Sequence, residues 1–277
     1  MNANPVTQHF IKRVNATNSV GIDDQLAVEE PLEIRIAYYI DGGKTEKAIS
    51  VTMRTPGNDE ELAVGFLFTE GIIQHAAQIE KVTLPVFREN TVVVTLDSSF
   101  EPKLGSLERN FYTTSSCGVC GKASVDAIKT ASNYLHFDKP ISIDRHILFK
   151  LEKQIAQRQD IFETTGGLHA SSIFDQNGDF LLLREDVGRH NALDKLIGAT
   201  LTAGLVPLSQ HILLLSGRAS FELIQKASMA GIQIVAAIGA PSSLAVQLAE
   251  ESGITLIGFL KKDKFNVYSG FDRIQEI

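Results

Sequence analysis

The second half of the chain alternates short apolar strand patterns with helical patterns, and this alternation constrains the fold more than any other feature of the sequence. Short apolar runs predict strands at residues 171–174, 180–183, 211–216, 233–238 and 255–260. Apolar residues at helical spacing predict helices at residues 125–135, 147–158, 190–201, 221–230 and 242–251. Strands that alternate with helices are typical of a layered α/β domain.

The first half of the chain has a different pattern. Alternating apolar residues predict strands at residues 33–40 and 48–53, joined as a hairpin by a loop that contains Asp41, Gly42 and Gly43. Asn58 is followed three positions later by Glu61, a pair that can cap a helix by satisfying its free amides. We therefore expect a helix from there to about residue 71, and two further strands at residues 79–87 and 91–96.

These patterns divide the 277 residues into three parts. The first stretch is polar and without a clear period, so we expect a tail or arm at residues 1–30 with a single short strand. An α+β domain is expected at residues 31–110 and an α/β domain at residues 111–277. The chain is long enough for each domain to bury a core of its own.

Charge and apolar patterning exclude several classes of protein. The formal net charge is −7, so the chain has no overall basic surface for nucleic acid. Its first residues lack a basic region followed by an apolar run, and its longest apolar stretches are too short for a membrane helix. We therefore expect a soluble cytoplasmic protein that binds neither nucleic acid nor membranes.

Two cysteines, Cys117 and Cys120, lie three positions apart in a loop rich in glycine and serine. In the cytoplasm such a pair seldom forms a structural disulfide. A helix is expected to begin just after the pair, at Lys122, and the amides at a helix N-terminus favour the thiolate form of a nearby cysteine. The neighbouring glycines leave the loop pliable. The pattern favours Cys117 as a reactive thiolate, with Cys120 as a resolving or orienting neighbour.

Three other interpretations of the cysteines stay open on spacing alone. Both could be small buried side chains, although the polar residues around them weigh against a core position. They could be two ligands of a zinc site, since other ligands could come from histidines elsewhere in the chain, namely His136, His146 and His169. They could also form a thioredoxin-like dithiol, although such a pair is expected earlier in a compact βαβ unit.

Polar motifs lie where the predicted strands of the second half begin or end. They occupy residues 164–171, 185–195 and 216–220, and the carboxyl ends of two strands make residues 216–218 and 239–242 candidate binding edges. Glycines there permit close backbone approach, and an arginine such as Arg218 suits a phosphate. The alternative is that Gly188 and Gly217 are ordinary turn residues and that Arg189 pairs with Asp186 or Asp194.

A cationic loop follows the last predicted strand. Lys261, Lys262 and Lys264 lie close together in it, which would suit a pyrophosphate or the phosphates of a guanine nucleotide. Most runs of charge are simply solvated, and this explanation stays open as well. The sequence contains neither the glycine-rich dinucleotide-binding motif nor the P-loop motif, so a different kind of phosphate site would be needed.

Four motifs, in this order, resemble the formate dehydrogenase accessory sulfurtransferase family, FdhD. They are Cys117-Gly-Val-Cys120-Gly, Thr165-Gly-Gly-Leu-His169, Glu185-Asp-Val-Gly-Arg-His-Asn191 and Ser216-Gly-Arg-Ala-Ser220. The resemblance covers most of the chain from about Leu32 onward. It implies a sulfurtransferase, that is, a sulfur carrier protein required for formate dehydrogenase activity. It also implies a cytidine-deaminase-like layered α/β C-terminal domain, preceded by a smaller α+β domain, and a homodimer.

The resemblance further implies a donor, an acceptor and site residues. A cysteine desulfurase would donate sulfur to Cys117 as a persulfide, and the acceptor would be the molybdenum cofactor, as bis-molybdopterin guanine dinucleotide, before its insertion into formate dehydrogenase. No catalytic metal of the chain's own is implied. The segment that matches the family's cofactor-binding loop consists of Phe259, Leu260, Lys261, Lys262, Asp263 and Lys264.

Several points stay open beside this resemblance. The segment departs from the family pattern, because related sequences often have glycine and arginine where this chain has Lys262, Asp263 and Lys264. Asp263 should repel a phosphate unless it faces away. The role of Cys120 is undecided, as is contact of the cofactor with His169, Arg189, His190 or Arg218. The alternatives from other classes are a cofactor-binding chaperone that transfers no sulfur and a zinc-stabilised interaction module.

Overall fold

The computed structural model describes residues 4–102, 104, 134 and 140–275. Its helices are α1 (Asp59–Thr69), α2 (Arg145–Ala156), α3 (Asp160–Thr165), α4 (Arg189–Thr202), α5 (Phe221–Met229) and α6 (Ser243–Glu251), with short 3-10 turns at Ala76–Gln78 and Phe271–Arg273. Its strands are β1 (Val6–Val14), β2 (Ser19–Ala27), β3 (Glu30–Ile40), β4 (Gly43–Arg54), β5 (Ile79–Thr83), β6 (Thr91–Leu96), β7 (Ile143–Asp144), β8 (His169–Asp175), β9 (Phe180–Asp186), β10 (His211–Leu215), β11 (Ile234–Ala237), β12 (Thr255–Gly258), β13 (Asn266–Ser269) and β14 (Ile274–Gln275).

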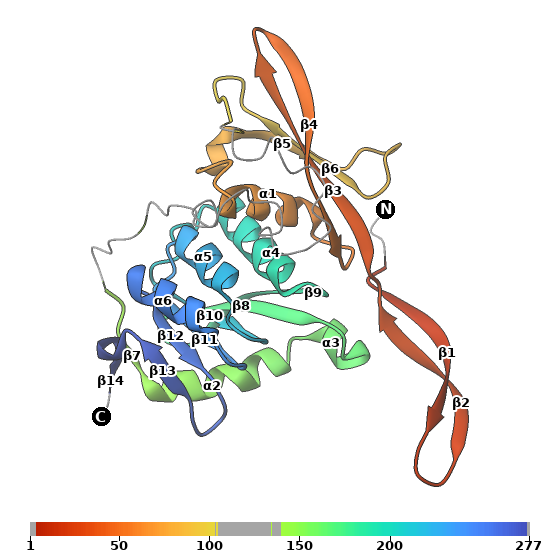
Figure 1. Ribbon diagram of the computed structural model, residues 1–277, viewed down its shortest axis with the longest axis vertical. Coiled ribbons are helices and arrows are strands. Elements are labelled where there is room, and N and C mark those ends of the chain that lie inside the picture. The colour runs from red at the N-terminus through yellow and green to blue at the C-terminus, as the bar shows by residue number, and fades with distance from the viewer. Residues whose placement is uncertain (1–3, 103, 105–133, 135–139, 276–277) are drawn as a thin grey trace.

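A six-stranded sheet in the order β13-β12-β11-β10-β8-β9 forms the centre of the second half (Figure 1). Strands β10, β11 and β12 run parallel, whereas β8, β9 and β13 are antiparallel to their neighbours. The strands and helices predicted for residues 147–260 are confirmed, with boundaries shifted by a few residues. The predicted helix at 125–135 lies outside the described residues. The fold class is therefore mixed α/β, while the deaminase-like layering stays a prediction.

Helices cover both faces of this sheet because its strands are apolar on both sides. Leu213 and Leu215 of β10 face α4, α5 and α6 in one core, while Ile212 and Leu214 of the same strand face α2 in another. This is the period-2 alternation of a strand buried on both sides. Local sequence also sets where α2 begins, since the Asp144 carboxylate accepts a hydrogen bond from the His146 backbone N–H at 2.7 Å.

The first half forms a four-stranded sheet in the order β4-β3-β6-β5, with α1 packed against it. Its strands and helix were predicted from the sequence and are confirmed, although β5 ends at Thr83 instead of residue 87. The predicted side-chain cap of α1 is wrong. Asn58 precedes the helix with a left-handed φ of 58° and its side chain makes no capping hydrogen bond, because capping requires an extended backbone at that residue.

The two halves share one core through α1 and α4. Leu62 and Leu67 of α1 belong to the same apolar cluster as Leu193 and Leu196 of α4. The division of the chain near residue 110 lies outside the described residues, so the proposed domain boundary stays a prediction.

Two glycines allow α1 and α4 to cross with their backbones in contact. A Cβ at Gly65 would clash with the Asp194 carbonyl oxygen, and one at Gly198 would clash with that of Glu61. We expect Gly65→Ala to lower the free energy of unfolding by about 2–3 kcal/mol, because the helices must separate. Urea denaturation would measure this loss. Gly43→Ala is the control, since its Cβ would meet only the Ile40 carbonyl oxygen at 3.5 Å; an equal loss in both variants would refute the close crossing.

The N-terminal segment differs from the sequence prediction. Instead of a single short strand, it forms an antiparallel ribbon of β1 and β2, each nine residues long, that projects from the rest of the molecule in Figure 1. Most of its side chains are exposed on both faces, so the apolar alternation that would mark its strands is absent. The short elements α3, β7, β13 and β14 were also missed.

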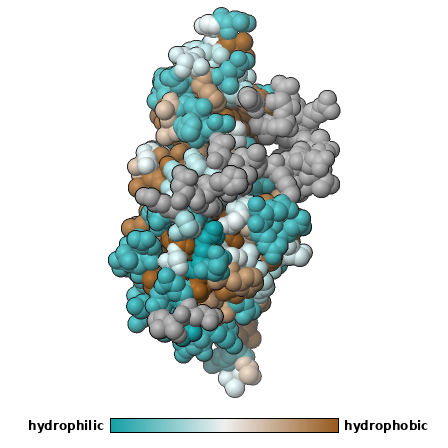
Figure 2. All heavy atoms as spheres, turned by 90° about the vertical axis from the view of Figure 1, so that its left-hand side faces the viewer, coloured by the Kyte–Doolittle hydropathy of each residue, from teal (hydrophilic) through white to brown (hydrophobic). Residues whose placement is uncertain are grey.

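Hydrophilic and hydrophobic residues are not separated into distinct regions on the visible surface. The face shown in Figure 2 mixes hydrophilic and hydrophobic residues. Among the described residues, no helix has the length and apolar character needed to cross a membrane.

Candidate functional site

The polar motifs of the second half meet at one edge of the six-stranded sheet, and this edge is formed by the ends of its strands, not by an outer strand. This edge holds the carboxyl ends of the parallel strands β10, β11 and β12. It also holds the start of β8 and the end of β9, because Ser171 pairs with Leu215 and His169 pairs with Asp186 in antiparallel register. Residues 216–218 and 239–242, which the sequence offered as candidate binding edges, both lie here, and the His169 and Arg189 motifs join them; ligand binding at this edge stays a prediction.

The loops after the three parallel strands are hydrogen-bonded into one layer. The Gly239 N–H donates to the Gly217 carbonyl at 2.9 Å, and the Phe259 N–H donates to the Gly239 carbonyl at 3.1 Å. A Cβ at Gly239 would lie 2.9 Å from the Gly217 oxygen, so these backbones can approach only because residue 239 is a glycine. A Cβ at Gly217 would lie 3.1 Å from Nδ1 of His169, which places the imidazole directly against this loop.

A buried ion pair anchors the turn that leads into α4. The Asp186 carboxylate lies 2.7 Å from Lys195 Nζ and accepts hydrogen bonds from the backbone N–H groups of Gly188 at 2.8 Å and Thr55 at 3.2 Å. Lys195 Nζ also donates to the Thr55 carbonyl at 2.8 Å. Because Thr55 follows β4, this network ties the first half of the chain to the site. Sequence reasoning missed it, since no local pattern connects Thr55 with Asp186.

Arg189 does not make the ion pairs considered from the sequence. Asp186 pairs with Lys195, and Asp194 pairs with Lys226 at 2.9 Å, so that alternative is wrong. The Arg189 Nε atom is buried and has no hydrogen-bond partner among the described residues. Buried polar atoms are normally paired, so this one calls for an explanation. An anion bound at the edge would supply the missing acceptor.

His169 lies in the same positive surroundings. Burial lowers its pKa, and electrostatic interaction with Arg189 and His190 lowers it further, against an opposing effect of Asp186. A lowered pKa favours the neutral imidazole near neutral pH, which can donate one hydrogen bond and accept another. Arg189, at the N-terminus of α4, adds a positive charge to this edge in an otherwise acidic protein.

His190 faces α5 rather than open solvent. Its Nε2 lies 3.8 Å from a Glu222 carboxylate oxygen and 3.5 Å from Ser220 Oγ. The interaction with His190 lowers the pKa of Glu222 to about 2, although burial opposes this shift. His190 therefore positions α5 beside the site and is less available to a ligand than His169 or Arg189.

This pair predicts a pH dependence of stability. Because the pKa of Glu222 in the folded protein lies below its usual value of 4.5, the ionised carboxylate stabilises the fold above about pH 4.5. That contribution is lost as the pH falls toward about 2. Urea denaturation of Glu222→Gln should show a shallower acid decline than the wild type. The control is Glu250→Gln, at an exposed position on α6, whose free energy of unfolding should fall with decreasing pH as steeply as that of the wild type. If Glu222→Gln also followed the wild-type pH dependence, the pairing of Glu222 with His190 would be contradicted.

The predicted cofactor-binding segment forms the connection between β12 and β13, next to the same edge. Phe259 is 42% exposed and has a left-handed φ of 53°, which turns the chain away from the sheet. Leu260 is buried in the core, so its side chain cannot reach a ligand. Lys261, Lys262, Asp263 and Lys264 form an exposed tip closed by a hydrogen bond from the Lys261 N–H to the Lys264 carbonyl at 2.9 Å.

The cysteines lie outside the described residues, as does His136. Neither the position of Cys117 nor that of Cys120 is therefore part of the site geometry given above. Within the described residues, no three histidine, cysteine or acidic side chains are grouped so that they could hold a metal ion.

Comparison with known proteins supports the resemblance seen in the motifs. The FdhD/NarQ family model matches residues 27–275. The chain is 47% identical over 272 residues to the sulfur carrier protein FdhD of Mycolicibacterium paratuberculosis, covering 95% of this chain and 97% of that protein. It is 42% identical over 260 residues to the protein of the same name from Sulfurisphaera tokodaii, covering 94% and 95%.

A solved structure shows the same fold. The crystal structure of a putative formate dehydrogenase accessory protein from Desulfotalea psychrophila superposes with a TM-score of 0.73, covering 98% of this chain and 100% of that one at 21% identity. The family model spans nearly the whole chain and includes every motif described above. The chain therefore belongs to the FdhD/NarQ family.

Proposed function

We propose that this protein is a sulfur carrier for the maturation of formate dehydrogenase. Its relatives carry the name sulfur carrier protein, and the similarity extends over almost the full length of both chains. The observation that carries the proposal is the convergence of four separate segments, around His169, Arg189, Gly217 and Phe259, on one edge of the sheet. Such an edge suits an extended anionic acceptor better than a single small substrate.

The sulfur would travel as a persulfide on Cys117. The Cys117 thiolate attacks the terminal sulfur of a cysteine desulfurase persulfide, a new S–S bond forms on Cys117, and the desulfurase cysteine leaves as a thiolate. The acceptor would be the bis-molybdopterin guanine dinucleotide form of the molybdenum cofactor. In the transfer the S–S bond on Cys117 would break, Cys117 would leave as a thiolate, and the terminal sulfur would bind the molybdenum, whose reduced form would supply the two electrons. The cofactor is cargo here, bound before its insertion into formate dehydrogenase.

The proposed edge offers groups for the anionic parts of this cargo. Arg189 presents a guanidinium whose Nε is buried and lacks a partner among the described residues. Arg218, which is exposed, follows β10, and the lysines of the 259–264 segment follow β12. A guanidinium binds phosphate oxygens through two parallel hydrogen bonds, and lysines add attraction without fixed geometry. Asp263 then has to point away from the bound phosphates.

Replacement of Arg189 tests the edge directly. We expect Arg189→Gln to weaken binding of guanosine diphosphate, which carries the nucleotide end of the proposed cargo, by about tenfold, because one charge-assisted contact is lost. Isothermal titration calorimetry would measure the affinity. Arg158→Gln is the matched control, since Arg158 stacks on Phe180, with the guanidinium 4.3 Å from the ring centroid, away from the edge. Equal affinities for wild type and Arg189→Gln would exclude Arg189 from the site.

The sulfur step has its own test. Purified protein is incubated with a cysteine desulfurase and cysteine, and mass spectrometry locates the added sulfur. Added mass on the peptide that contains Cys117 supports the carrier. Unloaded protein that still restores formate dehydrogenase activity would instead identify a cofactor chaperone that transfers no sulfur.

We further propose that the protein works in the cytoplasm as a homodimer and that its α/β domain is layered as in cytidine deaminases.

A further inference from the structure

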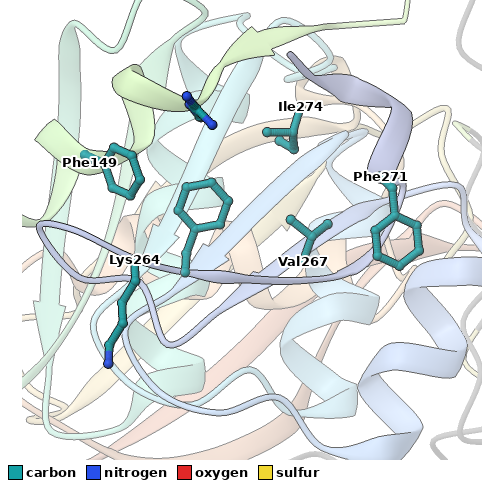
Figure 3. Close-up of a pocket in the computed structure, with 7 residues that line it drawn as sticks. Phe149, Lys264, Val267, Phe271 and Ile274 are labelled. Atoms are coloured by element: carbon teal, nitrogen blue, oxygen red, sulfur yellow. The ribbon is translucent and has the colours of Figure 1, made fainter. Parts of the chain in front are cut away.

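A cavity of about 340 Å³ lies on the face of the six-stranded sheet that α2 covers, beside the outer strand β13 (Figure 3). Phe149 of α2, Phe265 and Phe271 line it, together with Val267 of β13 and Ile274 of β14. The Phe149 and Phe265 rings pack at 5.2 Å between centroids and form one wall. Phe271 is 67% exposed, which is unusual for so large an apolar side chain. The cavity is large enough for one apolar side chain of a partner.

The charged residues that line the cavity, among those that the structure describes, are both cations. They are Arg145, in the first turn of α2, and Lys264, and none of the carboxylates in residues 4–102 and 140–275 lines the cavity. Lys261 and Lys262 extend the positive charge along the neighbouring loop, where Asp263 is the one acidic residue. In a protein with a formal net charge of −7 this is a local reversal of sign. It favours an acidic partner over a neutral or basic one.

Strand β13, which lies beside the cavity, is an outer strand of the sheet and is paired with another strand on one side only. It is the last strand of the six-stranded sheet, and within the described residues its backbone hydrogen bonds run only to β12. Free N–H and C=O groups along an edge strand can accept an added strand from another chain. Val267 lies in this strand and lines the cavity, so an added strand would run directly beside the apolar opening.

We propose that β13 and this cavity form a docking site for an extended acidic segment of a partner protein. The segment adds to the edge of β13 as a strand and places an aromatic or large aliphatic side chain between Phe149, Phe265 and Phe271. Carboxylates on either side of that anchor meet Arg145 and Lys264. Main-chain bonds provide affinity in this mode of recognition, and the pocket and charges provide specificity.

A second copy of this chain fits the site poorly. Pairing β13 with β13 of another copy about a two-fold axis would bring the lysine-rich loops and Arg145 of both copies to one interface. Like charges at such an interface oppose association. The charge pattern therefore favours a different chain over self-association, and the experiment below includes self-association as an outcome against the proposal.

The test uses the full-length protein and two synthetic peptides with blocked ends. The acidic probe is Glu-Val-Glu-Phe-Glu-Val-Glu, and its counterpart replaces every glutamate by lysine. Titration is followed in amide correlation spectra of isotopically labelled protein. We expect saturable shifts of the Asn266–Ser269 amides with the acidic peptide and at least about fivefold weaker binding of the basic one. Shifts confined to other regions, or equal binding of both peptides, would overturn the proposal.

Matched variants separate the pocket from general charge effects. Arg145→Glu is expected to weaken binding of the acidic probe by about fivefold or more, whereas Lys150→Glu, on an exposed position of the same helix, is expected to leave it unchanged. Phe271→Ala should weaken binding similarly, but Phe162→Ala, a 42% exposed residue on α3, should not. If neither pocket variant weakened binding of the acidic probe, an acidic partner would be refuted. Chemical shifts of the β13 amides that change with protein concentration in the absence of peptide would refute it as well, because they would indicate self-association.

Discussion

Lys226→Met is expected to lower the free energy of unfolding by about 3–5 kcal/mol, because it leaves a buried carboxylate without its counter-charge. Lys226 Nζ lies 2.9 Å from the Asp194 carboxylate and 3.6 Å from that of Glu70, and it also donates to Thr69 Oγ1 at 2.9 Å. Burial alone would lower the pKa of Lys226, but attraction to Asp194 and Glu70 overcomes it and raises the pKa. The lysine therefore remains charged.

This cluster joins α1, α4 and α5, so its loss affects the contact between the two halves of the chain. Denaturation by urea at neutral pH, followed by circular dichroism, would measure the change. The double variant Asp194→Asn with Lys226→Met should be less destabilised than Lys226→Met alone, because it contains no unpaired buried charge at residue 194. The Thr69 hydroxyl, which donates to Asp194 Oδ1 at 2.8 Å, can donate to the asparagine oxygen instead. That ordering separates an unpaired charge from simple loss of packing.

The control for Lys226 is a lysine on the surface. The Lys81 side chain is 55% exposed, and its Nζ lies 3.9 Å from Oε1 of Glu80. Lys81→Met should change the stability by less than about 0.5 kcal/mol, because exposed ion pairs contribute little. If Lys226→Met were no more destabilising than Lys81→Met, the buried cluster would not hold the two halves together.

Cys117→Ala is expected to reduce sulfur loading of the protein to background. A persulfide needs a thiolate to form on, and in this proposal Cys120, the second cysteine of the chain, orients the loop and does not carry the sulfur. The measurement is radiolabelled sulfur bound per chain after incubation with a desulfurase and labelled cysteine. Restoration of formate dehydrogenase activity in an extract that lacks the wild-type protein gives a second readout, which should fall in parallel.

Cys120→Ala is the natural comparison, since it keeps the proposed carrier and removes its neighbour. If Cys120 only orients the loop, this variant should load sulfur more slowly but to the same final level. Full loading of Cys117→Ala would sink the assignment of Cys117 as carrier. Retained thermal stability of both variants would show that the losses reflect chemistry rather than unfolding.

Local patterns in the sequence predicted the main elements well, and the reason is physical. Val235 and Ala237 face one core while Ile234 and Ala236 face the other, so β11 is continuously apolar and recognisable without tertiary information. The ribbon of β1 and β2 lacked such a signal, because most of its side chains are exposed on both faces. The cap of α1 failed for another reason, since the backbone at Asn58 is left-handed and no capping pattern reports that conformation.

The sequence by itself determined the α/β class, the helices and strands around the site, and the motif set that marks the family. Only the tertiary structure decided which of those residues act together. Strand order and antiparallel register bring His169, Arg189, Gly217 and Phe259 to the same edge of the sheet, and the Asp186 network adds Thr55 from the first half of the chain. Such contacts depend on non-local packing of whole elements, whereas helix and strand patterns depend on neighbours a few residues apart.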